Sequence, residues 1–149
     1  MTLLLNLTST LCIGLLIGTE FAVSVFVNPV LRKLDGRAQT EAIRLFARRL
    51  GTAMPFWYSL SLLLLIIETV ERRQQSGALL LCTASAIWAA VIVLTLLFLV
   101  PINNRMAQMK PGVFSESAQR EHKRWNFLHH FRVAALGAAM ALFLTGIHV

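Results

Sequence analysis

The sequence has little charge: Asp, Glu, Lys and Arg together make up 14% of its 149 residues, whereas 56% are hydrophobic. Ordinary soluble domains contain about 25% charged residues, so the composition argues against a soluble fold. Cysteine is scarce too, and the two residues present, Cys12 and Cys82, allow one disulfide at most. We interpret both as small apolar fillers; a disulfide is the alternative, because both lie toward the same predicted membrane face.

Charged residues are almost missing from four long segments, which are 2–31, 50–67, 74–104 and 125–149. Crossing a bilayer takes about 20 apolar residues, so each segment is long enough to do so. The first lacks a basic region before it and exceeds signal-peptide length, so we expect it to remain in the mature protein. We predict one all-α membrane domain over residues 1–149, a four-transmembrane-helix bundle with helices at about 3–31, 51–70, 76–100 and 116–147.

Thirteen of the fourteen basic residues lie in the connections between these segments, six in the first, two in the second and five in the third. Cytoplasmic loops of membrane proteins collect Lys and Arg. We therefore predict a multi-pass protein of the cell (inner) membrane with both termini outside. The net charge of +7 is explained by contacts with anionic lipid headgroups, so we do not expect nucleic acid as a partner.

The first connection contains a short amphipathic pattern over residues 37–50. Its apolar residues, Ile43, Phe46, Ala47 and Leu50, follow the i, i+3, i+4, i+7 spacing of a helix, and arginines occupy the opposite face. The pattern predicts a short interfacial helix between transmembrane helices 1 and 2, with its arginines toward the headgroups. Residues 57 and 58, a tryptophan and a tyrosine, are expected close to the interface where aromatic belts form.

One basic residue, Arg132, lies inside an apolar segment, where a charge is costly and indicates a functional site. His122, Trp125 and His129 precede it at spacings of three, four and three residues, which places all four on one face of helix 4. We expect His122 at the membrane surface and His129 with Arg132 inside the membrane. An anchoring role for Trp125 and a purely structural role for His129 are the plain alternatives.

Helices 1 and 3 contribute polar residues at the same end of the predicted bundle. Glu20 and Asn28 are eight residues apart on one face of helix 1, and Asn103 follows the expected end of helix 3. At about 1.5 Å per residue, Glu20 lies roughly 18 Å from Arg32, close enough in depth to pair with Arg132. We therefore expect these residues to line one cavity with the helix 4 face. A structural ion pair between Glu20 and Arg132 is the alternative interpretation.

The sequence resembles the anthrone oxygenase-like family of small four-helix membrane proteins over nearly its whole length. The segments that carry the resemblance are Gly18-Thr19-Glu20, Asn28-Pro29, Pro101-Ile102-Asn103-Asn104-Arg105 and the run from Trp125 to Arg132. The resemblance implies oxidation of an anthrone, or another apolar aromatic or phenolic molecule, by molecular oxygen. The residue types suit this chemistry. His129 would take a proton, and Arg132, near Glu20, would stabilise the anion; Trp125 would stack on a ring, with Asn103 and Asn28 also binding substrate.

Two other functions stay open on the sequence alone. Bundle interiors often hold metals, and Glu20 and His129 would be the ligands, or His129 would bind haem as its single histidine. His122 and His129 are about 10 Å apart along a helix, too far for one metal ion. The third alternative is a carrier or accessory subunit that binds a hydrophobic small molecule without chemistry. The cofactor requirement and a homo-oligomeric state are not decided by the sequence.

Overall fold

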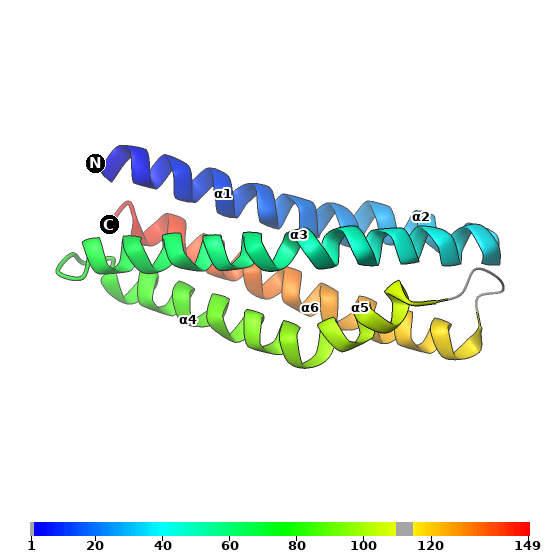
Figure 1. Cartoon of the computed structure of the whole chain (residues 1–149). Helices are drawn as coiled ribbons and strands as arrows, with labels where there is room; N and C mark the ends of the chain where they lie inside the picture. The colour runs from blue at the N-terminus through cyan, green and yellow to red at the C-terminus, as the bar shows by residue number, and fades with distance from the viewer. Residues whose placement is uncertain (1, 110–114) are drawn as a thin grey trace.

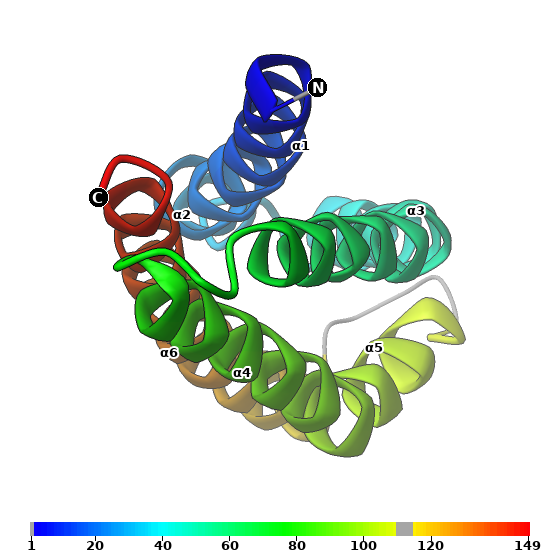
Figure 2. The same ribbon diagram turned by 90° about the vertical axis from the view of Figure 1, so that its left-hand side faces the viewer.

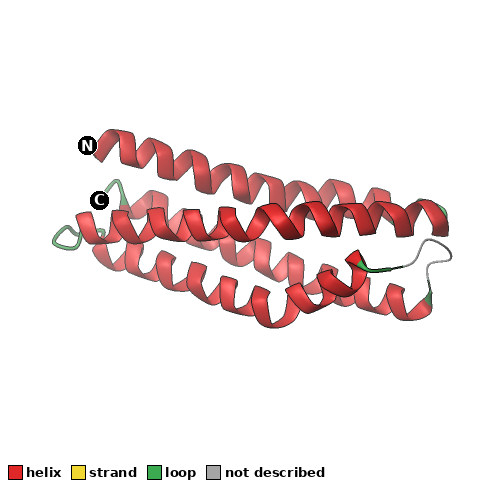
Figure 3. Cartoon of the chain, viewed as in Figure 1, coloured by secondary structure: helices red, strands yellow, loops and turns green. Residues whose placement is uncertain are grey.

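The structure, a computed structural model that describes residues 2–109 and 115–149, is a bundle of four long helical rods (Figure 1). The first rod consists of α1 (Thr2–Ala22), the π-helical turn η1 (Val23–Val27) and α2 (Asn28–Leu31). The second is α3 (Gly36–Glu71), and the fourth is α6 (Glu116–Gly146). The third consists of α4 (Ala78–Leu94), the π-helical turn η2 (Thr95–Leu99) and α5 (Val100–Ala107). The described residues contain no strand (Figure 3).

The rods run up and down, so that both termini and the α3–α4 connection lie at one end of the bundle (Figure 1). At the other end, α2 turns into α3, and α5 is followed in the chain by α6. We call this the basic end, because Arg32, Arg105 and Arg124 lie near it. Seen along its axis, the bundle has α4 beside α6 and α3 between α1 and α4 (Figure 2). The predicted four-helix bundle is therefore confirmed.

The outer surface of the bundle is apolar. Leu3, Phe56, Leu79 and Phe127 each expose three quarters or more of their surface. A soluble protein rarely shows so large an apolar surface, because its contact with water is unfavourable. All four rods are also long and apolar enough to cross a membrane. The chain is thus a multi-pass membrane protein.

The prediction of a separate interfacial helix over residues 37–50 is wrong. These residues are helical, but they form the first part of α3, which continues without a break to Glu71. The helix begins at Asp35, whose carboxylate accepts hydrogen bonds from the backbone N–H groups of two following residues. The apolar residues Ile43 and Ala47 pack on Ile102 of α5. Burial against the bundle therefore extends the helix where the sequence pattern suggested contact with lipid.

Helix 3 was expected to end near residue 100, and this boundary is also wrong. The rod passes through Pro101 and ends at Ala107. Proline has no N–H and its ring clashes with the carbonyl four residues earlier, which normally ends or kinks a helix. Here the preceding turn η2 is widened, and Val100 N–H donates to the carbonyl of Thr95, five residues back. The π turn accommodates the proline, so the rod continues into α5.

The termini end of the bundle is held by close backbone contact between α4 and α6. A Cβ atom placed on Gly77 would lie 2.0 Å from the carbonyl oxygen of Gly146, so only glycine fits there. Both cysteines are free thiols: Cys12 Sγ lies 3.6 Å from Ser61 Oγ, and Cys82 is exposed on α4. The disulfide alternative therefore does not apply in this structure.

Candidate functional site

The polar face of α6 lies inside the bundle. The rings of Trp125 and His129 stack in parallel, with centroids 4.6 Å apart and planes 13° apart. The ring of His122 is also parallel to that of Trp125, with the two centroids 6.3 Å apart. The stacked face of Trp125 is thus occupied by His129. A substrate ring, predicted to stack on Trp125, would have to use the rest of its surface.

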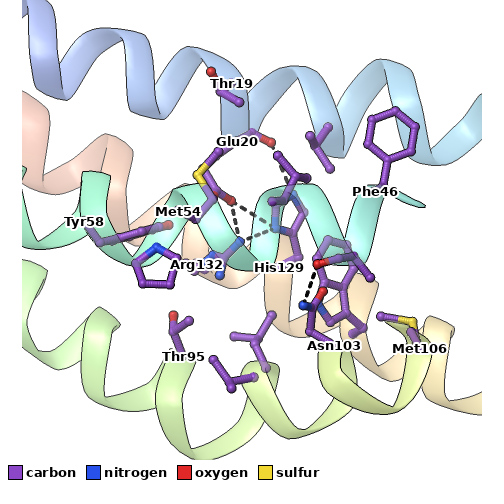
Figure 4. A pocket seen from close by; sticks show the side chains of 18 of the residues that line it. Thr19, Glu20, Phe46, Met54, Tyr58, Thr95, Asn103, Met106, His129 and Arg132 are labelled. Atoms are coloured by element: carbon purple, nitrogen blue, oxygen red, sulfur yellow. Dashed lines mark hydrogen bonds and ion pairs between the residues drawn. The ribbon is translucent and has the colours of Figure 1, made fainter. Parts of the chain in front are cut away.

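Glu20 of α1 meets Arg132 and His129 of α6 inside the bundle (Figure 4). Arg132 Nη2 donates to Glu20 Oε2 at 2.5 Å and lies 3.0 Å from His129 Nδ1. Glu20 Oε2 is also 3.2 Å from His129 Nδ1. All three side chains are buried or nearly so, with Glu20 3% and His129 1% exposed. We call them the Glu20–His129–Arg132 cluster; the expected contact of Glu20 with Arg132 is present.

The hydrogen bonds of His129 define its tautomer. Its Nε2 lies 3.2 Å from the backbone carbonyl oxygen of Glu20, which can only accept, so Nε2 carries a hydrogen. Nδ1 faces the N–H of Arg132 and the carboxylate of Glu20. Nδ1 is therefore the ring nitrogen whose lone pair can accept the hydrogen bond from Arg132. Both ring nitrogens thus have partners within the described residues, and neither is free to contact a ligand in this arrangement.

A cavity of about 200 Å³ adjoins the cluster and receives side chains from all four rods. It is larger than the roughly 150 Å³ cavity that holds one benzene ring. All the residues predicted for the site line it: Glu20, Asn28, Asn103, Trp125, His129 and Arg132. Most of the remaining wall is apolar, and it includes residues of both π turns. The cavity therefore suits a hydrophobic molecule with a few polar atoms.

The two asparagines of the cavity differ in their surroundings. Asn103 Nδ2 donates to the backbone carbonyl of Ala47 at 2.9 Å, which ties α5 to α3. Gly51 makes room for this contact, since a Cβ there would lie 2.7 Å from Asn103 Nδ2. Asn28 is buried, and its Nδ2 has no hydrogen-bond partner among the described residues. Asn28 is thus the asparagine whose N–H groups are available to a ligand.

Tyr58 is a site residue that the sequence did not reveal. It was expected with Trp57 in an interfacial belt, but it is 4% exposed and lines the cavity from α3. The guanidinium carbon of Arg132 lies 5.6 Å from the centre of its ring. Its hydroxyl is buried and has no hydrogen-bond partner among the described residues. The sequence held no clear signal for it, because Gly51, seven residues earlier on the same face of α3, is known to line the cavity only from the structure.

Trp57 and His122 also differ from expectation. Trp57 donates its ring N–H to the carbonyl of Cys12 at 3.0 Å, so it ties α3 to α1 instead of contacting lipid headgroups. His122, expected at the surface, is buried and lines the cavity near the basic end. Within residues 2–109 and 115–149, no three His, Cys, Asp or Glu side chains come together as metal ligands. A metal held by Glu20 and His129 would need a donor from another source.

Comparison with known protein families shows to which family the chain belongs. The sequence model of the anthrone oxygenase family matches residues 42–142, more than half of the chain. The chain belongs to the anthrone oxygenase family. The match includes Tyr58, Asn103, Trp125, His129 and Arg132, whereas Glu20 and α1 lie before it. No curated protein and no solved structure matches the chain.

Proposed function

We propose that this member of the anthrone oxygenase family is a membrane oxidoreductase that oxidises an apolar aromatic or phenolic ketone with molecular oxygen. The observation that carries the proposal is the Glu20–His129–Arg132 cluster at the wall of a mainly apolar cavity. Burying three ionisable groups inside a membrane bundle is costly, and ionisable residues found there usually mark functional sites. The family name supports the same type of reaction.

The chemistry begins with a proton on the CH₂ carbon opposite the ketone of an anthrone. Its removal gives an aromatic anion whose negative charge is shared with the ketone oxygen, and this electron-rich anion reacts with O₂. One oxygen atom becomes the second ketone of the anthraquinone, and the other leaves as water with the two hydrogens of the CH₂ group. The substrate carbon is oxidised and O₂ is reduced, so no further electron donor is needed.

Each member of the cluster has a role in this scheme. The pair of Glu20 Oε2 and His129 Nδ1, 3.2 Å apart, would accept the proton and hold it between them. Arg132 would stabilise the developing oxygen anion in a site shielded from water. Trp125, stacked on His129, would keep the imidazole in position. Asn28 and Asn103 would contact the polar atoms of the substrate or the edge of its ring system, since both line the cavity.

A ligand carrier without chemistry is the second candidate, and one observation favours it. Both nitrogens of His129 are engaged within the protein. A histidine that acts as a base must release Nδ1 from the N–H of Arg132 when substrate binds. A carrier has no such requirement, so measurement of turnover separates the two functions.

The test uses purified protein in lipid nanodiscs with anthrone and oxygen. We expect oxygen uptake and anthraquinone formation in a one-to-one ratio, and we expect His129→Asn to lower the rate at least a hundredfold, as for loss of a general base. The matched control is His130→Asn, because the neighbouring His130 is exposed and bonds to the carbonyl of Asn126. Anthrone binding without oxygen uptake in the wild type would support the carrier, and equal rates in both variants would remove His129 from the mechanism.

A further inference from the structure

A second cavity, of about 230 Å³, lies between η2 and α6 on the outside of the bundle. Its wall is apolar, and Leu94, Phe98 and Phe131 are exposed where it opens toward the lipid. Arg124 and Arg132 both line it, with Arg124 the nearer to the basic end along α6. The two arginines are eight residues apart on α6, or about 12 Å. We call this cavity the lipid groove.

The lipid groove and the cavity of the candidate site share three residues, Thr95, Leu99 and Arg132. These residues therefore form the partition between the lipid groove and the cavity of the candidate site. Thr95 and Leu99 begin and end η2, the widened turn before Pro101. Figure 4 shows Thr95 turned from its helix toward the centre of the cavity, on the side where Arg132 lies.

The partition carries two polar atoms without a partner among the described residues, Thr95 Oγ1 and Arg132 Nε. Both atoms are buried. The lack of a partner is unusual for a helical threonine in this chain, since Thr19, Thr69 and Thr83 each donate to the carbonyl four residues earlier. Buried polar groups are nearly always hydrogen-bonded, because an unpaired one costs about 1–3 kcal/mol. Two of them in one wall indicate a position that a ligand completes.

We propose that Thr95 and Arg132 form a subsite for the oxygen atom of an aromatic ketone or phenolate that enters from the bilayer through the lipid groove. An N–H of arginine can only donate, so the ligand atom must be an acceptor, and the positive charge favours an oxygen that carries negative charge. The aromatic side chains of Phe98 and Phe131 at the opening suit a ring. The identity of the ring rests on the proposed function, whereas the acceptor subsite is read from the partition itself.

The first experiment compares the binding of anthrone with that of anthracene, which has the same three rings and no oxygen. Binding is measured by fluorescence in nanodiscs under nitrogen, so that no turnover takes place. Thr95→Val should weaken anthrone binding roughly three- to tenfold, the effect of one hydrogen bond, and leave anthracene unchanged. Thr95→Ser should restore anthrone binding. Thr83→Val is the control, because Thr83 lies on the exposed side of α4.

The second experiment tests the entrance. Leu94→Trp fills the lipid groove and should slow the association of anthrone several-fold, whereas Val93→Trp, on the neighbouring lipid-facing position outside the groove, should not. Equal association rates in the two variants would overturn the entrance. Equal anthrone affinity in wild type and Thr95→Val would overturn the subsite.

The outcomes separate this inference from the proposed function. Anthrone binding that depends on Thr95, without oxygen uptake, would support the subsite and overturn the oxidase function. If Thr95→Val changed neither oxygen uptake nor anthrone affinity, the oxidase function would be supported and the subsite would be overturned. A fatty acid shares the acceptor chemistry but not the ring, and displacement of anthrone by decanoate at lower concentration than by anthraquinone would overturn a ring as the occupant.

Discussion

A single nitrogen of Arg132, Nη2, contacts both Glu20 Oε2 and His129 Nδ1, so one cation organises the whole cluster. The carboxylate neutralises the guanidinium, and the imidazole is held by a donor on one nitrogen and an acceptor on the other. Such an arrangement makes burial tolerable, because each ionisable group supplies the partner that the others need. It also leaves Arg132 Nε free for an oxygen of a ligand.

The role of Arg132 can be separated from that of a structural ion pair. Arg132→Met alone leaves Glu20 buried without its arginine partner, and loss of one partner of a buried pair costs about 3–5 kcal/mol. The double variant Glu20→Leu, Arg132→Met should recover most of this stability, since buried ion pairs add little over apolar substitutes. We expect the folded double variant to have no anthrone oxidation.

Thermal unfolding in detergent and oxygen uptake are the two measurements for these variants. Wild-type activity in the folded double variant would show that Arg132 only neutralises Glu20. Equal unfolding temperatures for the single and double variants would instead contradict the energetic account of the pair.

At the scale of elements, three rods pass a proline without ending. The second rod, α3, does so at Pro55 as a continuous α-helix, whereas the first and third rods pass Pro29 and Pro101 directly after a π turn next to the cavity. Asn28 N–H reaches the carbonyl of Val23 before Pro29, as Val100 N–H reaches that of Thr95 before Pro101. The widened turns bring backbone and side chains of α1 and α4 toward the site. π turns are often found at functional sites, since they shift the register of the side chains that follow.

The contact of α4 with α6 gives a prediction at this scale. Gly77→Ala places a methyl group on the backbone of Gly146, which cannot move away without displacing a helix. We expect a loss of about 1–3 kcal/mol, as for other overpacked sites, seen as a lower thermal unfolding temperature. Gly137→Ala is the control, because nothing lies within 4 Å of its added Cβ, and it should leave stability unchanged or slightly raised. Equal unfolding temperatures for the two variants would refute the close approach.

The molecule as a whole divides into a basic end and an end with few basic residues. The sequence segments 32–49 and 105–124, which belong to the basic end, contain eleven Lys and Arg residues, against two in the α3–α4 connection. We propose that the basic end faces the cytoplasm and both termini face outward, following the preference of cytoplasmic loops for positive charge. The Glu20–His129–Arg132 cluster would then lie closer to the cytoplasmic leaflet, and the lipid groove would open into it.

Reporter fusions test this orientation. Alkaline phosphatase fused after Val149 or Gln75 should be active, because it folds only outside the cytoplasm, whereas a fusion after Gln108 should be inactive. A fluorescent protein that folds only in the cytoplasm should give the opposite pattern at the same positions. Phosphatase activity at Gln108 together with fluorescence at Val149 would reverse the proposed topology.

The sequence by itself determined the four membrane-spanning helices and the pairing of Glu20 with Arg132. Both follow from local physics: the length of an apolar segment decides whether it spans a bilayer, and a charge inside a span needs a partner at its own depth. The periodicity of α6 likewise placed Trp125, His129 and Arg132 on one face.

Only the tertiary structure decided what each of these side chains contacts. The sequence could not show that Trp125 covers His129, that Tyr58 turns into the cavity, or that Thr95 lacks the usual bond to its own helix. Nor could it show that α3 begins well before its expected start, or that the α4–α5 rod continues past its expected end. The physical reason is that helix periodicity specifies a face, whereas the neighbour of that face depends on packing among all four rods.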